Sequence, residues 1–166
     1  MAKIDMFGTA KIDIKGQLFD LGEVYKHAHE WLEWHKYDVV ESKYAEKTKA
    51  DGKEFSITWE STRDVDEYTR FELDVKWSLY GVNDVEMAHE GKKIKLQTGN
   101  IVIEINAFII TDYDGKWETS RQNKFLKSFF EKYLYSGDLN RLKGQIWKQG
   151  WDLYNEMKAF LDLYQY

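Results

Sequence analysis

Apolar and polar residues alternate along the first segment of the chain, between residues 4 and 15. One side of the alternation holds apolar or small residues, which are Ile4, Met6, Gly8, Ala10, Ile12 and Ile14. A period of two is typical of a strand with one buried face. Because Gly8 interrupts the apolar side, we predict either one strand or a hairpin that turns at this glycine.

The spacing then changes to that of a helix with a defined beginning. Asp20 and Glu23 form an N-cap and capping box, and Phe19 is placed to pack on Val24 across the first turn. Apolar side chains follow three or four positions apart as far as His35. These features predict a helix from residue 20 to about residue 35.

From Tyr37 to Asp112 the pattern predicts strands only. Six stretches are separated by short turns rich in Gly, Asp and Asn, and they run over residues 37–47, 54–62, 67–80, 84–89, 92–97 and 100–112. Short turns favour antiparallel neighbours, because parallel strands need a long crossover. The alternation in residues 71–79 gives the sheet one apolar and one polar face, although Phe108 and Ile110 make part of the second face apolar.

Helical spacing returns after Gly115 and predicts two C-terminal helices. The first covers residues 119–135, with a capping-box pattern from Thr119 to Gln122, and Ser136 to Asp138 separate it from the second. The last helix carries an apolar seam of Leu139, Leu142, Ile146, Gly150, Leu153, Met157 and Phe160. This seam fits either the sheet or a second copy of the chain, so a homo-oligomer stays open.

Strands grouped before helices predict an α+β fold in a single domain over residues 1–166. We expect a mostly antiparallel sheet of about six to seven strands. An N-terminal helix and a C-terminal helical pair, with a long last helix, are expected to cover one face.

Composition narrows the setting of the protein. The 166 residues contain no Cys and no Pro, so disulfides, thiol nucleophiles and thiolate metal sites are excluded. The N-terminal segment lacks the apolar run of a signal peptide, and no stretch is apolar enough to cross a membrane. We therefore expect a cytoplasmic protein. The net charge is −5, although residues 115–150 hold eight basic and three acidic residues.

The stretch HAHEWLEWH, residues 27 to 35, is the one concentration of potential metal ligands. It departs from the HExxH motif because Glu33 stands where the second histidine would be. His29 and Glu33 could hold one ion together, but His89 is the only histidine elsewhere. We favour an ordinary amphipathic helix in which His35 is buried or lies on the flank of the apolar face, and in which His27 pairs with Glu23. No metal and no cofactor are predicted.

Two pairs of carboxylates are candidates for acid–base chemistry. Asp112 and Asp114 follow a predicted strand, and Asp64 and Asp66 share a predicted turn. Aspartates at turns usually serve backbone geometry, and we favour that interpretation here. The chain lacks a nucleophile elbow, a Walker loop and a dinucleotide-binding motif. The sequence therefore favours a protein without catalytic activity.

Two candidate binding surfaces remain. A curved sheet that holds a long helix can enclose an apolar pocket, and an apolar small molecule is then expected against Trp59, Phe71, Trp77 and Met87. The helix over residues 119–135 has basic residues on its flank and back, which are Arg121, Lys124, Lys127 and Lys132. Such a helix can bind an anionic membrane or nucleic acid, or it can simply pack on the core with its lysines in solvent.

The order of elements resembles the helix-grip domains of the START and polyketide-cyclase type, over nearly the whole chain. The resemblance implies a cavity between the sheet and the last helix. The chain departs from that family in having one helix after the first strand instead of two, and in the extra helix at 119–135. The stretches from Tyr25 to Tyr37 and from Asp112 to Glu118 also resemble short archaeal proteins of unknown function, which implies a cytosolic setting.

The sequence leads us to predict a non-catalytic binding or interaction module, with its contact surface on the basic, aromatic-rich C-terminal helices. The alternative is a helix-grip protein or enzyme that binds an apolar small molecule or lipid between the sheet and the long helix.

Overall fold

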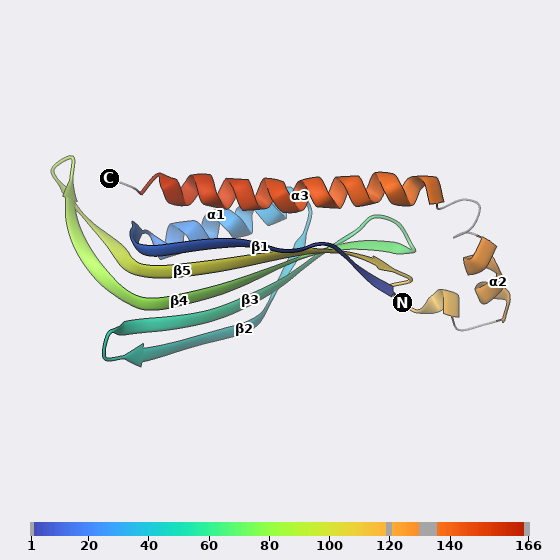
Figure 1. Ribbon diagram of the computed structural model, residues 1–166, viewed down its shortest axis with the longest axis horizontal. Helices are drawn as coiled ribbons and strands as arrows, with labels where there is room; N and C mark the ends of the chain where they lie inside the picture. The colour runs from blue at the N-terminus through green and yellow to red at the C-terminus, as the bar shows by residue number, and fades with distance from the viewer. Residues whose placement is uncertain (1, 119–120, 130–135, 165–166) are drawn as a thin grey trace.

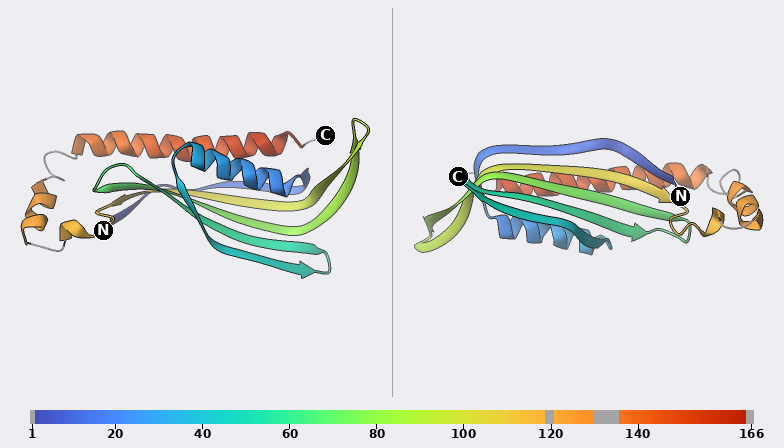
Figure 2. Two further views of the ribbon diagram at one scale, coloured as in Figure 1. Left: turned by 180° about the vertical axis from the view of Figure 1, so that it is seen from behind. Right: turned by 90° about the horizontal axis from the view of Figure 1, so that it is seen from below.

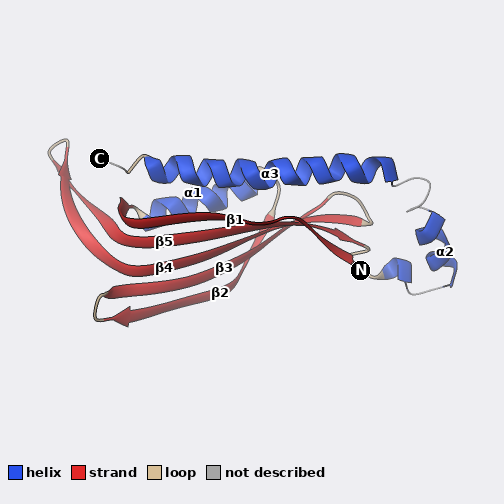
Figure 3. Cartoon of the chain, in the orientation of Figure 1, coloured by secondary structure: helices blue, strands red, loops and turns tan. Residues whose placement is uncertain are grey.

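The computed structural model describes residues 2–118, 121–129 and 136–164, and it confirms the α+β class (Figure 1, Figure 3). The strands are β1 (Ala2–Phe19), β2 (Asp38–Lys49), β3 (Gly52–Asp64), β4 (Thr69–His89) and β5 (Lys92–Thr111). The helices are α1 (Leu21–Trp34), the short 3-10 helix η1 (Lys116–Glu118), α2 (Arg121–Phe129) and α3 (Ser136–Asp162). None of the described helices is both long enough and apolar enough to cross a membrane.

The strands form one antiparallel sheet in the order β1-β5-β4-β3-β2. The first strand therefore pairs with the last, and the other strands follow as successive hairpins. Both α1 and α3 lie on the same face of the sheet, with α3 running along the strands (Figure 1, Figure 2). The predicted arrangement, an antiparallel sheet covered on one face by an N-terminal helix and a long last helix, is confirmed.

The sheet has five strands, fewer than the six to seven predicted, because β4 and β5 each continue through a position where a turn was expected. The stretches 67–80 and 84–89 form the single strand β4, and the stretches 92–97 and 100–112 form β5. Between Tyr80 and Asn83 the register shifts as β4 passes through Gly81, whose φ is 60°. Gly8, with a φ of 68°, likewise lies within the continuous strand β1 instead of turning a hairpin.

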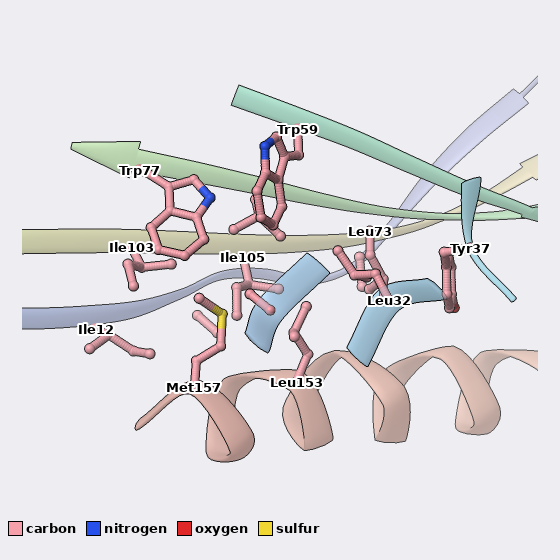
Figure 4. Packing of buried hydrophobic residues seen from close by; sticks show 14 of the residues in the cluster. Ile12, Leu32, Tyr37, Trp59, Leu73, Trp77, Ile103, Ile105, Leu153 and Met157 are labelled. Carbon is pink, nitrogen blue, oxygen red and sulfur yellow. The ribbon is translucent and has the colours of Figure 1, made fainter. Parts of the chain in front are cut away.

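The core lies between the helices and the apolar face of the sheet. It is built from alternate positions of the two central strands, which are Phe71, Leu73, Val75, Trp77 and Leu79 of β4 and Ile101, Ile103, Ile105, Ala107 and Ile109 of β5. Leu153 and Met157 of α3 point toward these side chains, and Leu32 and Tyr37 fill the space beside them (Figure 4). The period of two in the sequence thus correctly identifies the buried face.

The seam of α3 is buried against the sheet. Leu142, Ile146, Leu153 and Met157 are all at most 2% exposed. The sheet, within one chain, is therefore the partner of the seam. In contrast, α2 lies beyond one end of the sheet, next to η1, so only one member of the predicted C-terminal pair covers the sheet (Figure 1).

Candidate functional site

A pocket of about 740 Å³ opens at the end of the sheet where α1 begins. We call it the hairpin pocket. It is lined by the first turn of α1, the β2–β3 hairpin, the bulge of β4 and a residue of β5, and the side chains that define it are Leu21, Tyr25, Tyr44, Phe55, Asp84 and Gln97. Its volume lies in the range of pockets that bind small molecules.

Two glycines, Gly52 and Gly99, lie very close to the bulge of β4 at this end of the sheet. A Cβ at Gly52 would lie 2.8–2.9 Å from Asn83 Nδ2, the Gly81 carbonyl carbon and the Val82 carbonyl oxygen. A Cβ at Gly99 would lie 3.0 Å from the Tyr80 carbonyl oxygen. The β2–β3 hairpin can thus approach the bulge of β4 closely. Beyond the bulge the β4–β5 hairpin curves toward the helices (Figure 1).

Three aromatic side chains supply much of the apolar wall. Tyr44 and Phe55, on adjacent strands, contact each other edge to face at a centroid distance of 6.5 Å. Tyr25 of α1 packs edge to face on the buried Trp59 at 4.7 Å. The Tyr25 hydroxyl donates to Glu41 Oε2, and burial together with this carboxylate raises the pKa of Tyr25 to about 12. Tyr25 therefore stays a neutral hydroxyl at physiological pH.

A hydrogen-bonded chain forms the polar wall at the start of α1. The Leu21 amide donates to Gln97 Oε1 at 2.9 Å, and Gln97 Nε2 donates to Asp84 Oδ1 at 3.1 Å. Lys95 Nζ lies 3.2 Å from the other oxygen of Asp84. The bonds from Gln97 and Lys95 hold the pKa of Asp84 below its usual value, so this carboxylate stays charged. Gln97 also satisfies one of the free amides of the helix start.

Two lysines of the β2–β3 hairpin line the pocket, and both are paired. Lys49 Nζ lies 2.9 Å from Glu54 Oε1, and Lys53 Nζ lies 3.0 Å from Glu46 Oε1. These hydrogen bonds raise the pKa of each lysine, so both ammonium groups stay charged. Because each charge already has a carboxylate partner, neither lysine is available as an unpaired anion-binding group.

The four residues predicted from sequence to bind a ligand lie elsewhere. Trp59, Phe71 and Trp77 are fully buried in the packed core. The rings of Trp59 and Trp77 lie in the space in which the prediction placed a ligand (Figure 4). Met87 lies on β4 beyond the bulge and is half-buried. None of the four lines the hairpin pocket. The reason is that a polar bulge and a helix start form the pocket, whereas the prediction considered only the apolar centre of the sheet.

The histidines of α1 take part in packing and ion pairs. His27 Nε2 lies 3.0 Å from Glu156 Oε1 of α3, so the predicted pairing of His27 with Glu23 is wrong. The ring of His27 also stacks on Phe160 at 4.2 Å. In this way His27 joins α1 to α3.

The other two histidines of this stretch contact residues of α1 itself. His35 stacks on Trp31 at 3.8 Å and hydrogen-bonds its carbonyl. His29 Nδ1 lies 3.4 Å from Glu33 Oε1. Within the described ranges, no group of three or more histidine, aspartate or glutamate side chains is placed to hold a metal ion.

One aspartate of each pair holds a turn, as predicted, whereas Asp64 is ion-paired with Arg70 and Asp114 with Lys116. Asp66 Oδ1 accepts the amides of Tyr68 and Thr69 at 2.8 and 2.7 Å. Asp112, at a φ of 49°, accepts the Trp117 amide at 3.1 Å and lies 1% exposed. These contacts fix the backbone at the start of β4 and at the end of β5.

The basic surface predicted on α2 is only partly described. Arg121 and Lys124 are exposed, Lys127 is half-buried, and Lys132 lies outside the described residues, as does Thr119 of the predicted capping box. Phe125 is 71% exposed on the same helix. Cationic side chains and an aromatic ring thus share an accessible helix that makes little contact with the sheet (Figure 1).

Comparison with family models, curated proteins and solved structures found no match. The resemblances noted from the sequence therefore stay predictions, and the interpretation of the site depends on its geometry alone.

Proposed function

We propose that the protein binds a small molecule in the hairpin pocket. The observation that carries this proposal is a pocket of about 740 Å³ that combines three aromatic rings with a pre-ordered polar wall. Small-molecule sites typically pair an apolar body with a few oriented hydrogen-bonding groups. Here Gln97 and Asp84 are held in place by neighbours before any ligand arrives, which lowers the entropy cost of binding.

Three charged groups of the lining already have protein partners, which are Gln97 and Lys95 for Asp84, Glu54 for Lys49 and Glu46 for Lys53. We therefore propose binding alone, and no chemical step, for this pocket. The helix-grip resemblance implies a cavity between the sheet and the last helix, whereas the hairpin pocket is lined by α1 and by no described residue of α3.

Native mass spectrometry of the full chain tests the proposal. Thr48 is exposed on β2 and lines the pocket, so Thr48→Trp adds a large ring to the pocket without changing the core. Lys47→Trp is the matched control, because its neighbour position places the same ring on the opposite face of the strand. We expect a co-purifying small molecule on the wild-type and Lys47→Trp proteins and its loss from Thr48→Trp. Unliganded wild-type protein, together with a fragment screen without hits in the pocket, would contradict the proposal.

A second candidate function is docking of α2 on an anionic lipid surface. It is favoured by the 71% exposure of Phe125 beside Arg121 and Lys124 on a helix outside the sheet–helix core. An exposed ring inserts into lipid, and basic side chains bind the headgroups. In a sedimentation assay with phosphatidylserine vesicles, the wild-type chain should be retained in the vesicle pellet.

The double variant Lys124→Glu, Lys127→Glu should lose this retention, while Lys92→Glu, Lys93→Glu, which carries the same charge change on the β4–β5 hairpin, should keep it. Equal retention of both variants would contradict docking through α2. Binding to nucleic acid, with no retention on vesicles, would assign the basic helix to a different partner.

A further inference from the structure

The charges in and around the hairpin pocket are unbalanced toward the negative. The imbalance concerns the side chains that line the pocket and the side chains that are ion-paired or hydrogen-bonded to them. The carboxylates are Asp20, Glu41, Glu46, Glu54 and Asp84, and the ammonium groups are Lys49, Lys53 and Lys95. Five carboxylates against three ammonium groups leave a field that favours a cation in the pocket.

Two side chains that line the pocket beside the polar wall, Asp20 and Asn83, each keep an acceptor oxygen that a ligand can use. Asp20 receives the Glu23 amide on Oδ1, at 3.1 Å, and Asn83 donates from Nδ2 to the carbonyls of Asp51 and Gly81. Within the described residues, the second oxygen of Asp20 and the Oδ1 of Asn83 accept no hydrogen bond. A ligand that brings hydrogen-bond donors can satisfy these two oxygens.

The aromatic wall suits the same kind of ligand. Tyr25, Tyr44 and Phe55 present rings whose faces attract positive charge and whose area matches a flat apolar body. The two lining lysines do not oppose a cation strongly, since Glu46 and Glu54 neutralise them at about 3 Å.

We propose, on the basis of the function proposed above, that the ligand of the hairpin pocket is an organic ammonium compound with a flat aromatic or apolar body. The ammonium group binds beside Asp20, Asn83 and Asp84, and the apolar body lies against the three aromatic rings. Fatty acids and other apolar carboxylates are disfavoured by the same charges.

Matched pairs of probes test the charge preference by isothermal titration calorimetry on the full chain. Tryptamine is compared with indole-3-propionate, tyramine with 3-(4-hydroxyphenyl)propionate, and phenethylamine with 3-phenylpropionate. Each pair keeps its ring and exchanges an ammonium group for a carboxylate. We expect each amine to bind about tenfold more tightly than its acid, as one additional favourable ionic contact gives.

The variant Asp20→Asn separates charge from folding, because asparagine is as good an N-cap as aspartate. It should weaken amine binding about threefold to tenfold and leave the acids unchanged or tighter. Asp13→Asn, an exposed position on the opposite face of the sheet, removes one charge far from the pocket and should change neither. Thr48→Trp should abolish binding of every amine.

The outcomes distinguish this inference from the function on which it rests. Acids that bind as tightly as their amines, in a manner that Thr48→Trp blocks, overturn the charge preference and leave the small-molecule pocket intact. If none of the six probes binds, the ammonium class is overturned. In that case the native mass spectrum still decides the proposed function independently.

Discussion

Asp74 lies on the open face of the sheet, among acidic neighbours on the central strands. Glu72 precedes it by two positions on β4, and Glu60 lies opposite it on the neighbouring strand β3. Burial of the carboxyl, followed by the charge and hydrogen bond of Glu72, raises the pKa of Asp74 to about 7. Lys3 of β1 opposes this shift from 3.9 Å. The folded chain thus holds a proton here that an unfolded chain would release.

The sign of the pH dependence follows from that proton. Because the folded-state pKa lies above the unfolded value, the free energy of unfolding should fall as pH rises from about 4 to about 7. Asp74→Asn should remove much of this fall and stabilise the protein at pH 8 by on the order of 1–2 kcal/mol. Urea unfolding between pH 5 and pH 8 measures the effect. The exposed Asp13→Asn is the control, and an unchanged slope in Asp74→Asn would contradict the assignment.

Single residues also mark how far local sequence predicts structure. The Asp20 cap is set by residues within one turn, and it was predicted and confirmed. The partner of His27 is Glu156, which stands 129 positions away, so helical spacing could only propose the local Glu23. Likewise, nothing near Asp74 in sequence indicates that Glu60 and Lys3 lie beside it. Local sequence patterns predict helix caps. The partners and pKa values of ionisable side chains depend on which strands and helices pack side by side.

At the scale of elements, Gly52 and Gly81 allow the β2–β3 hairpin to pack against the bulge of β4. Gly52 has a φ of 134°, and a Cβ there would meet backbone atoms at 2.9 Å. Residues with a Cβ rarely adopt this backbone conformation. The backbone atoms that a Cβ would meet cannot move aside as the end of a flexible side chain can. The bulge was missed from sequence because a glycine between two strand patterns also predicts a turn.

Alanine substitutions test this corner of the sheet. Gly52→Ala should lower the free energy of unfolding by about 2 kcal/mol or more, and it should reduce ligand binding, because the pocket wall must shift. Gly144→Ala is the matched control, since no heavy atom lies within 4 Å of its added Cβ in the exposed part of α3. The control should stabilise the chain by about 0.5–1 kcal/mol. Thermal unfolding of both variants measures the contrast, and equal midpoints would contradict a close approach at Gly52.

The long helix is held by its seam, which the spacing of apolar residues predicted. Leu153 is fully buried, whereas Leu163, just beyond the end of α3, is 68% exposed. Leu153→Ala should therefore cost about 2–5 kcal/mol, and Leu163→Ala should cost less than about 0.5 kcal/mol. Denaturant titration gives both values. A small cost at Leu153 would mean that α3 does not pack on the sheet as described.

At the scale of the whole molecule, the sheet has one face under α1 and α3 and one open face (Figure 2). Alternation in the strands and the seam in the last helix predicted this layering. The hairpin pocket could not be predicted in the same way, because it depends on how α1, two hairpins and a bulge meet. The register of β2 and β3 brings Tyr44 and Phe55 together, and the packing of α1 on Trp59 adds Tyr25 to the same pocket.

A co-crystal structure of the full chain with tryptamine tests the central claim most directly. We predict the indole ring against Tyr25, Tyr44 and Phe55, with the ammonium nitrogen within hydrogen-bonding distance of an oxygen of Asp20, Asn83 or Asp84. A hairpin pocket filled by its own side chains, or tryptamine bound at a different place on the chain, would contradict the account.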